Sequence, residues 1–258
     1  MRRSFVSSTI LFTILLWAVT VNASTSVEQN ANADLLRQLP ADEILQLTAQ
    51  QQEFMLLQRE NMTSYTKGTV ILLPDASEHP ASPKYINLLR QQLTDYGWYT
   101  LALMPPSLPV ELTADTLQAY QQSLRERLAA AQQQAQQHSG VTIVIAQGSS
   151  AALLNQLFAN AQLTEPAAFI MLGAYLPERA LNQDFAKALA THQVPTLDIS
   201  TGQDNRMVLG QLRYRKQLAN KHLKAVYRQR LINGSGYNAD TQQWVFQEIY
   251  GWLSSVGL

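Results

Sequence analysis

Apolar residues in this chain fall into short runs separated by longer amphipathic stretches. The runs cover residues 69–73, 99–103, 142–146, 168–172, 196–199 and 225–231. Apolar residues at helical spacing fill the intervals at 84–96, 113–137, 151–160, 181–192 and 209–222, and again at 241–254. Near-continuous apolar strands that alternate with helices are typical of βαβ units with helices on both faces of a parallel sheet. The pattern predicts an α/β three-layer sandwich with a mostly parallel sheet of about six strands.

The part of the chain before the first of these runs follows a different pattern. Residues 24–40 begin with Ser, Asn and Gln and are predicted to form a mobile leader. Over 41–61, apolar residues recur with a helical rhythm, which predicts a helix. We find neither an internal repeat nor an interdomain linker after this point, so residues 41–258 are predicted to form one domain.

The first 23 residues resemble a secretory signal peptide. Arg2 and Arg3 precede an uncharged apolar stretch from Phe5 to Val21, and Ala23 ends a Val-Asn-Ala cleavage pattern. An uncleaved membrane anchor is the alternative, since the stretch is barely long enough to span a bilayer. Cleavage would release a chain that begins at Ser24. Because the usage of Gln and Ala favours a bacterial source, we expect a periplasmic protein with no membrane attachment after cleavage.

Composition and charge exclude several classes of function. The chain has 19 basic and 19 acidic residues and a formal net charge of zero, so it lacks the basic field that attracts nucleic acid. It contains no cysteine, which excludes disulfides, thiol catalysis and thiolate metal sites. No glycine-rich phosphate loop occurs, and no two histidines lie close together in the sequence. We therefore expect no cofactor and no metal.

The loop after the run at 142–146 is the most informative for chemistry. There a buried strand passes into a helix through Gln147, Gly148, Ser149 and Ser150, which resembles the small-x-nucleophile-x-small turn of a nucleophile elbow. In one register Gly148 stands at the nucleophile position, directly after the strand. In the other register Ser150 stands there. The first register is favoured because it keeps small residues where the helix packs on the strand, and it leaves no attacking side chain.

With these motifs in view, the chain resembles the α/β-hydrolase superfamily. It looks most like an uncharacterised bacterial family, of proteobacterial type, whose function is unknown. The resemblance covers roughly residues 54–254, and its parts are moderately specific only in their order and spacing. The residues that carry it are 68–75, Glu78-His79-Pro80, Leu88-Leu89-Arg90, Leu93, 97–103, 146–150, 194–199 and Gly251-Trp252-Leu253.

The resemblance assigns positions to a catalytic triad that is incomplete. Asp204, after Gly202 and Gln203, matches the acid position. The loop that should hold the base contains Tyr237 but no histidine, and Pro74-Asp75 replaces the His-Gly pair that often supplies an oxyanion amide. A carboxylate without an activated nucleophile cannot perform acyl transfer.

The remaining polar residues offer one alternative site. His79 follows the first strand on the side of the crevice, where it could pair with Ser150 or Ser149. His138, His192 and His222 are predicted to be solvated or capping residues at the opposite edge. Asp198 lies within a strand, where a buried carboxylate needs an amide or arginine partner.

Three hypotheses of function follow. The favoured one is a noncatalytic binding or scaffold protein whose partner is a small molecule or a periplasmic protein. Its ligand would lie against Pro74, Asp75, Gln147, Gly148, Ser149 and Ser150, with a helix N-terminus able to bind an anion. The second is a serine esterase or peptidase that uses Ser150 or Ser149 with His79. The third is a protein whose leader, residues 24–39, docks on a partner.

Overall fold

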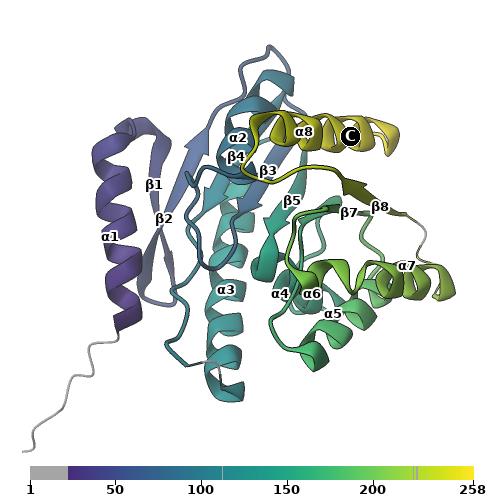
Figure 1. The fold of residues 1–258 in the computed structure, drawn as a ribbon. Helices are drawn as coiled ribbons and strands as arrows, with labels where there is room; N and C mark the ends of the chain where they lie inside the picture. The colour runs from purple at the N-terminus through teal and green to yellow at the C-terminus, as the bar shows by residue number, and fades with distance from the viewer. Residues whose placement is uncertain (1–22, 112, 223, 225) are drawn as a thin grey trace, which may run out of the picture.

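The computed structural model describes residues 23–111, 113–222, 224 and 226–258, and Figure 1 shows their arrangement. At its centre is an eight-stranded sheet in the order β1-β2-β4-β3-β5-β6-β7-β8, in which β8 forms one edge. β1 pairs with β2, and β2 with β4, in antiparallel fashion, and the other neighbours are parallel. The strands are β1 (Ile44–Ala49), β2 (Gln52–Arg59), β3 (Gly68–Leu73), β4 (Trp98–Leu103), β5 (Val141–Gln147), β6 (Ala168–Leu172), β7 (Thr196–Thr201) and β8 (Tyr227–Ile232).

The predicted α/β class is confirmed, but the sheet has two strands more than expected. Strands β1 and β2 form a hairpin over the stretch that was predicted to be a helix. Its turn, Gln50 and Gln51, has φ angles of 44° and 70°, the left-handed pair that suits a two-residue hairpin. Strand β2 buries side chains on both faces of the sheet: Phe54 and Leu56 on one, Met55 and Leu57 on the other. The helical prediction failed because a short apolar run fits a buried strand equally well.

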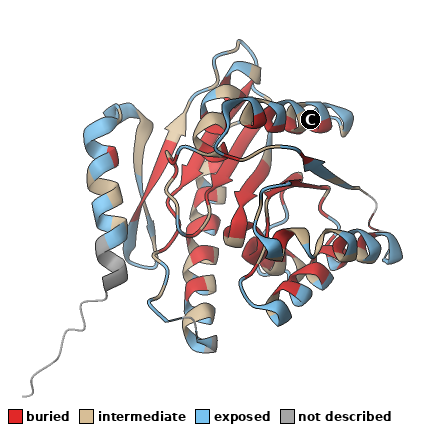
Figure 2. Cartoon of the chain, viewed as in Figure 1, coloured by how far each residue is buried: buried red, intermediate tan, exposed pale blue. Residues whose placement is uncertain are grey.

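Helices cover both faces of the sheet, and Figure 2 shows the buried residues concentrated along the sheet between them. One face packs against α3 (Ala114–Ala135), α4 (Gly148–Ala159) and α5 (Arg179–Thr191). The other face packs against α1 (Ala23–Gln38), α2 (Tyr85–Gln92) and α8 (Ala239–Ser255). Shorter elements complete the fold: η1 (Ala41–Glu43), η2 (Leu93–Tyr96), α6 (Arg206–Leu209) and α7 (Leu212–Lys221), the last packed against α5.

Local side-chain chemistry explains where the helices start and stop. Thr113 caps α3 by accepting the Thr116 N–H at 3.2 Å, while the Thr116 hydroxyl accepts the Thr113 N–H at 2.8 Å, which is a capping box. The Asn238 side chain accepts the Thr241 N–H at the start of α8. Gly97 ends η2 with a φ of 86°, a conformation that favours glycine and turns the chain into β4.

The expected mobile leader is instead mostly helix α1. Leu35 of this helix is buried in the core, and Glu28 accepts two hydrogen bonds from the Arg127 guanidinium of α3, at 2.7 and 3.1 Å. Arg127 also donates to the Met104 carbonyl, so it joins α1 to the end of β4. Only Ala23 of the predicted signal peptide lies within the described residues. Among the described helices, none combines the length and apolar character needed to cross a bilayer.

Candidate functional site

The junction between β5 and α4 lies at the carboxyl ends of the parallel strands. β5 ends at Gln147, and α4 begins at Gly148, whose φ is 58°. Glycine adopts this left-handed conformation without the steric cost that a Cβ imposes. A Cβ built at Gly148 would lie 2.5 Å from both Cγ and Oδ1 of Asp75. The carboxylate of Asp75 thus occupies the space that any side chain at this turn would need.

Asp75 is held in that position by hydrogen bonds from two segments. Its Oδ1 accepts the Ser149 N–H at 2.8 Å, the Ser149 hydroxyl at 2.5 Å and the Ala76 N–H at 2.9 Å. Bonds of this kind to an ionised oxygen are about twice as strong as neutral ones. Its Oδ2 accepts only a long bond of 3.3 Å, from the Ser77 hydroxyl. One oxygen is therefore saturated, and the other keeps capacity to accept.

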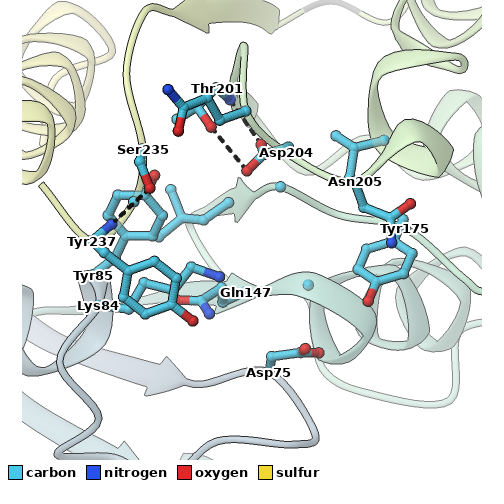
Figure 3. A pocket seen from close by; sticks show the side chains of 16 residues that line it. Asp75, Lys84, Tyr85, Gln147, Tyr175, Thr201, Asp204, Asn205, Ser235 and Tyr237 are labelled. Carbon is cyan, nitrogen blue, oxygen red and sulfur yellow. Dashed lines mark hydrogen bonds between the residues drawn. The ribbon is translucent and has the colours of Figure 1, made fainter.

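A small polar cavity of about 160 Å³ lies on one side of Asp75. Figure 3 shows Gln147 at its centre, with Asp204 and Thr201 on one side and Asp75 on the other. Gln147 donates to the Glu78 carboxylate at 2.7 Å, which fixes the orientation of its amide because a carboxylate only accepts. Its Oε1 is buried and has no hydrogen-bond partner. A buried acceptor of this kind favours a donor supplied by a ligand or by water.

The far side of this cavity comes from two loops and the start of α2. Asp204 accepts the Thr201 N–H at 2.7 Å and the Thr201 hydroxyl at 2.9 Å, which holds it at the end of β7. Tyr237, in the loop after β8, is exposed, and the Lys84 ammonium lies 5.4 Å from its ring centre. Lys84 is also 3.5 Å from Glu78, so its charge is paired. Burial, followed by the charge of Asp204, raises the pKa of Tyr85 and keeps that phenol protonated.

A larger, mainly apolar cavity of about 640 Å³ lies on the other side of Asp75, between α3 and the loop after β6. Asp75 and Tyr175 line both cavities. Burial, and then the charge of Asp75, raises the pKa of Tyr175, which stays a neutral hydrogen-bonding group. The apolar part of its lining consists of Leu108, Leu117, Tyr120, Leu153, Leu176, Pro177 and Leu181.

Ser150 and His79, the alternative catalytic pair, are not hydrogen-bonded to one another. Ser150 is fully buried in α4, and its hydroxyl has no hydrogen-bond partner. It lies near the phenol of Tyr120, although without the geometry of a hydrogen bond, and the pKa of that phenol is raised chiefly by burial. The His79 Nδ1 accepts the Ala81 N–H at 3.3 Å, and burial lowers the pKa of the ring. His79 thus shapes its own loop.

Of the histidines predicted to be solvated or capping, His192 stands at the C-cap of α5 but is not solvated. This residue is buried, its Nε2 lies 2.9 Å from Asn155 Oδ1, and Lys224 lies 3.2 Å from its Nδ1. Since a lysine only donates, Nδ1 is the acceptor and the ring is neutral. Burial, and then the charge of Lys224, lowers the pKa of His192 to about 3. His138 stacks on Tyr99, whereas His222 is exposed as expected.

Asp198 has partners for one of its two carboxylate oxygens, whereas its buried Oδ1 has no hydrogen-bond partner. It is fully buried, and its Oδ2 accepts the Tyr227 hydroxyl at 2.8 Å and the Gln229 amide at 3.2 Å. The buried Arg215 Nε lies 3.5 Å from the same oxygen. These contacts join β7 to β8 and α7, so Asp198 has a structural role away from the cavities.

Sequence comparison places the chain in a family. The model of a family described as "Protein of unknown function (DUF3530)" matches residues 18–114 and 109–255. The chain belongs to the DUF3530 family. A search of curated proteins gives no significant match.

Solved structures show which fold this DUF3530 member has. The carboxylesterase Cest-2923 from Lactobacillus plantarum is 13% identical, with a TM-score of 0.63 over 83% of this chain and 97% of that one. Est1E from Butyrivibrio proteoclasticus is 11% identical, with a TM-score of 0.62 over 83% and 98%. A putative dienelactone hydrolase from Klebsiella pneumoniae is 14% identical, with a TM-score of 0.60 over 82% and 97%. The fold is therefore that of the α/β-hydrolases.

Several residues of the site were not singled out from the sequence. Tyr85 and Lys84 stand at the start of α2, and Tyr175 lies in the loop after β6. That loop follows the carboxyl end of a parallel strand, which marks it as a site loop without identifying a residue. Among the described residues, no group of three acidic or histidine side chains is arranged to hold a metal ion.

Proposed function

We propose that this chain is an exported α/β-hydrolase-like protein that binds a small molecule in the crevice around Asp75 without hydrolysing it. In this proposal Gly148 stands at the nucleophile position, Asp204 at the acid position and Tyr237 where the base would be. The single observation that carries the proposal is the placement of Asp75. Its carboxylate fills the space beside Gly148 from which a nucleophile would attack.

The hydrogen bonds of Asp75 support the same conclusion. In α/β-hydrolases the oxyanion hole consists of the N–H of the residue after the nucleophile and an N–H from the loop after a central strand. Here the corresponding amides are those of Ser149 and Ala76, and both donate to Asp75 Oδ1. An internal carboxylate oxygen thus takes the place of a developing oxyanion, which leaves these donors unavailable to a substrate carbonyl.

A general base is the second requirement for hydrolysis by a serine. Among the described residues that line the two cavities there is no histidine. The hydroxyl of Ser149 donates to a carboxylate, and that of Ser150 is fully buried without a hydrogen-bond partner. Neither serine is therefore hydrogen-bonded to a histidine that could activate it as the base of a Ser-His pair.

A fluorophosphonate probe tests the proposal directly. The protein should be recovered from a periplasmic extract, where export with cleavage predicts a mass corresponding to residues 24–258. Circular dichroism should first show that the sample is folded. We expect no covalent labelling, with Ser149→Ala and Ser150→Ala as matched controls. Labelling that either substitution abolishes would establish a serine hydrolase and refute the proposal, whereas an uncleaved mass would refute only the export.

A further inference from the structure

The larger cavity has a one-sided distribution of charge. Asp75 and Glu178 are the ionisable carboxylates in its lining, and none of its described lining residues is a lysine, arginine or histidine. Of the fifteen other described residues in its lining, eight are leucine, proline or tyrosine and seven are neutral polar residues. Its volume, about 640 Å³, is within the range of sites that enclose small organic ligands. A molecule that fills it must be largely apolar, and any charge that it carries should be positive.

Two of the groups with free hydrogen-bonding capacity beside Asp75 are acceptors. Asp75 Oδ2 receives only the long bond from Ser77, and the buried Gln147 Oε1 receives none. Asp75 lines both cavities, and Gln147 lines the small one beside it. The one cation among the described lining residues of the small cavity, Lys84, is paired with Glu78. Asp75 Oδ2 and Gln147 Oε1 therefore both have room for a donor from a ligand.

From this arrangement, and resting on the proposed binding function, we infer that the ligand is a small amphiphile with an ammonium head. The head lies beside Asp75 and Gln147, and the apolar body lies in the larger cavity against α3 and α4. An ammonium group supplies up to three donors and no acceptor, which matches the two free acceptor oxygens. Its charge also balances that of Asp75, whose other oxygen is already saturated.

Three probes that share one chain and differ in head group test this inference. Decylammonium, 1-decanol and decanoate should be titrated below their aggregation concentrations into the folded mature protein by isothermal calorimetry. A hydrogen bond to a charged group contributes enough for us to expect decylammonium to bind at least about tenfold more tightly than decanol. Decanoate should bind more weakly than both, because its charge repels Asp75.

Substitutions locate the head and the chain separately. Asp75→Asn keeps an Oδ1 acceptor for the amides of Ser149 and Ala76, so the fold should persist. This substitution should weaken the binding of decylammonium by at least about tenfold and change the affinity for decanol by no more than about twofold. The matched control is Glu178→Gln, which removes the other, exposed carboxylate of the cavity and should change neither affinity by more than about twofold. Leu117→Gln, in the apolar lining, should lower the affinity for all three probes.

Several results would overturn the inference: tighter binding of decanoate, an Asp75→Asn variant that still prefers decylammonium, or no binding of any probe by a folded sample. Labelling by fluorophosphonate would instead overturn the proposed function, so the two failures are distinguishable.

Discussion

The contact between Gly148 and Asp75 leads to a quantitative prediction about stability. Replacing Gly148 with alanine puts a Cβ where Asp75 Cγ and Oδ1 now lie, 2.5 Å away. The left-handed φ of 58° costs a non-glycine residue roughly 1–2 kcal/mol. Displacing the carboxylate also weakens its bonds to Ser149, and bonds to a charged group contribute about 1.5–3 kcal/mol. Gly148→Ala should therefore lower the free energy of unfolding by about 3 kcal/mol.

A double-mutant cycle separates these two causes. In an Asp75→Ala background no carboxylate stands in the way, so Gly148→Ala should cost only the backbone component, about 1–2 kcal/mol. The difference, a coupling of about 1–2 kcal/mol, measures the steric and hydrogen-bond conflict. Urea unfolding followed by tryptophan fluorescence gives all four free energies. The single Gly148→Ala substitution should lower Tm by about 6–12 °C in a domain of this size.

The reasoning would be refuted by additive costs, agreeing within about 0.5 kcal/mol, because these would show that the two positions do not compete for space. A Gly148→Ala variant as stable as the native protein would refute the backbone component as well.

Two further predictions concern buried charges away from the cavities. Because burial lowers the pKa of His192 from 6.5 to about 3, the unfolded chain takes up a proton that the folded chain does not accept until lower pH. The contribution of His192 to the free energy of unfolding is therefore complete above pH 6.5 and decreases as the pH falls. Urea unfolding should show a loss of about 2 kcal/mol from pH 7 to pH 5, and His192→Gln should abolish this loss. Asp198→Ala leaves the buried Arg215 without its charge partner and should lower the free energy of unfolding by about 3–5 kcal/mol. Adding Arg215→Met should restore most of that free energy, and no recovery would contradict the ion-pair explanation.

The central strands could be predicted from the sequence because a parallel strand covered on both faces is a continuous apolar run. Strand β6 was located to the residue, and β3, β4 and β5 to within one residue at each end. The hairpin β1–β2 could not be predicted in this way, since its apolar residues are equally compatible with a helical spacing. The same limit applies to α1, whose attachment depends on Glu28 meeting Arg127, 99 residues further along the chain.

In the candidate site, too, the local turn could be predicted from the sequence, whereas contacts between distant segments could not. The small residues around Gly148 indicate a tight strand-to-helix turn, because only small side chains let the two backbones approach. Asp75 was named as a ligand-binding candidate from its loop, but its bonds to Ser149 join positions 74 residues apart. The burial of His192 depends likewise on Lys224, from a distant segment. Such contacts follow from the order of strands in the sheet, which periodicity alone does not specify.

The exposed edge of the sheet at β8 bears on how the molecule behaves when crowded. An edge strand presents unpaired backbone donors and acceptors that can recruit another chain. On β8, Arg228 and Arg230 both stand on the exposed face, and Arg230 is paired at 3.0 Å with Glu248 of α8. If two copies met through this edge, arginines would lie near arginines, and like charges on facing strands destabilise a pairing. The charges on edge strand β8 thus disfavour the association of several copies through their sheets.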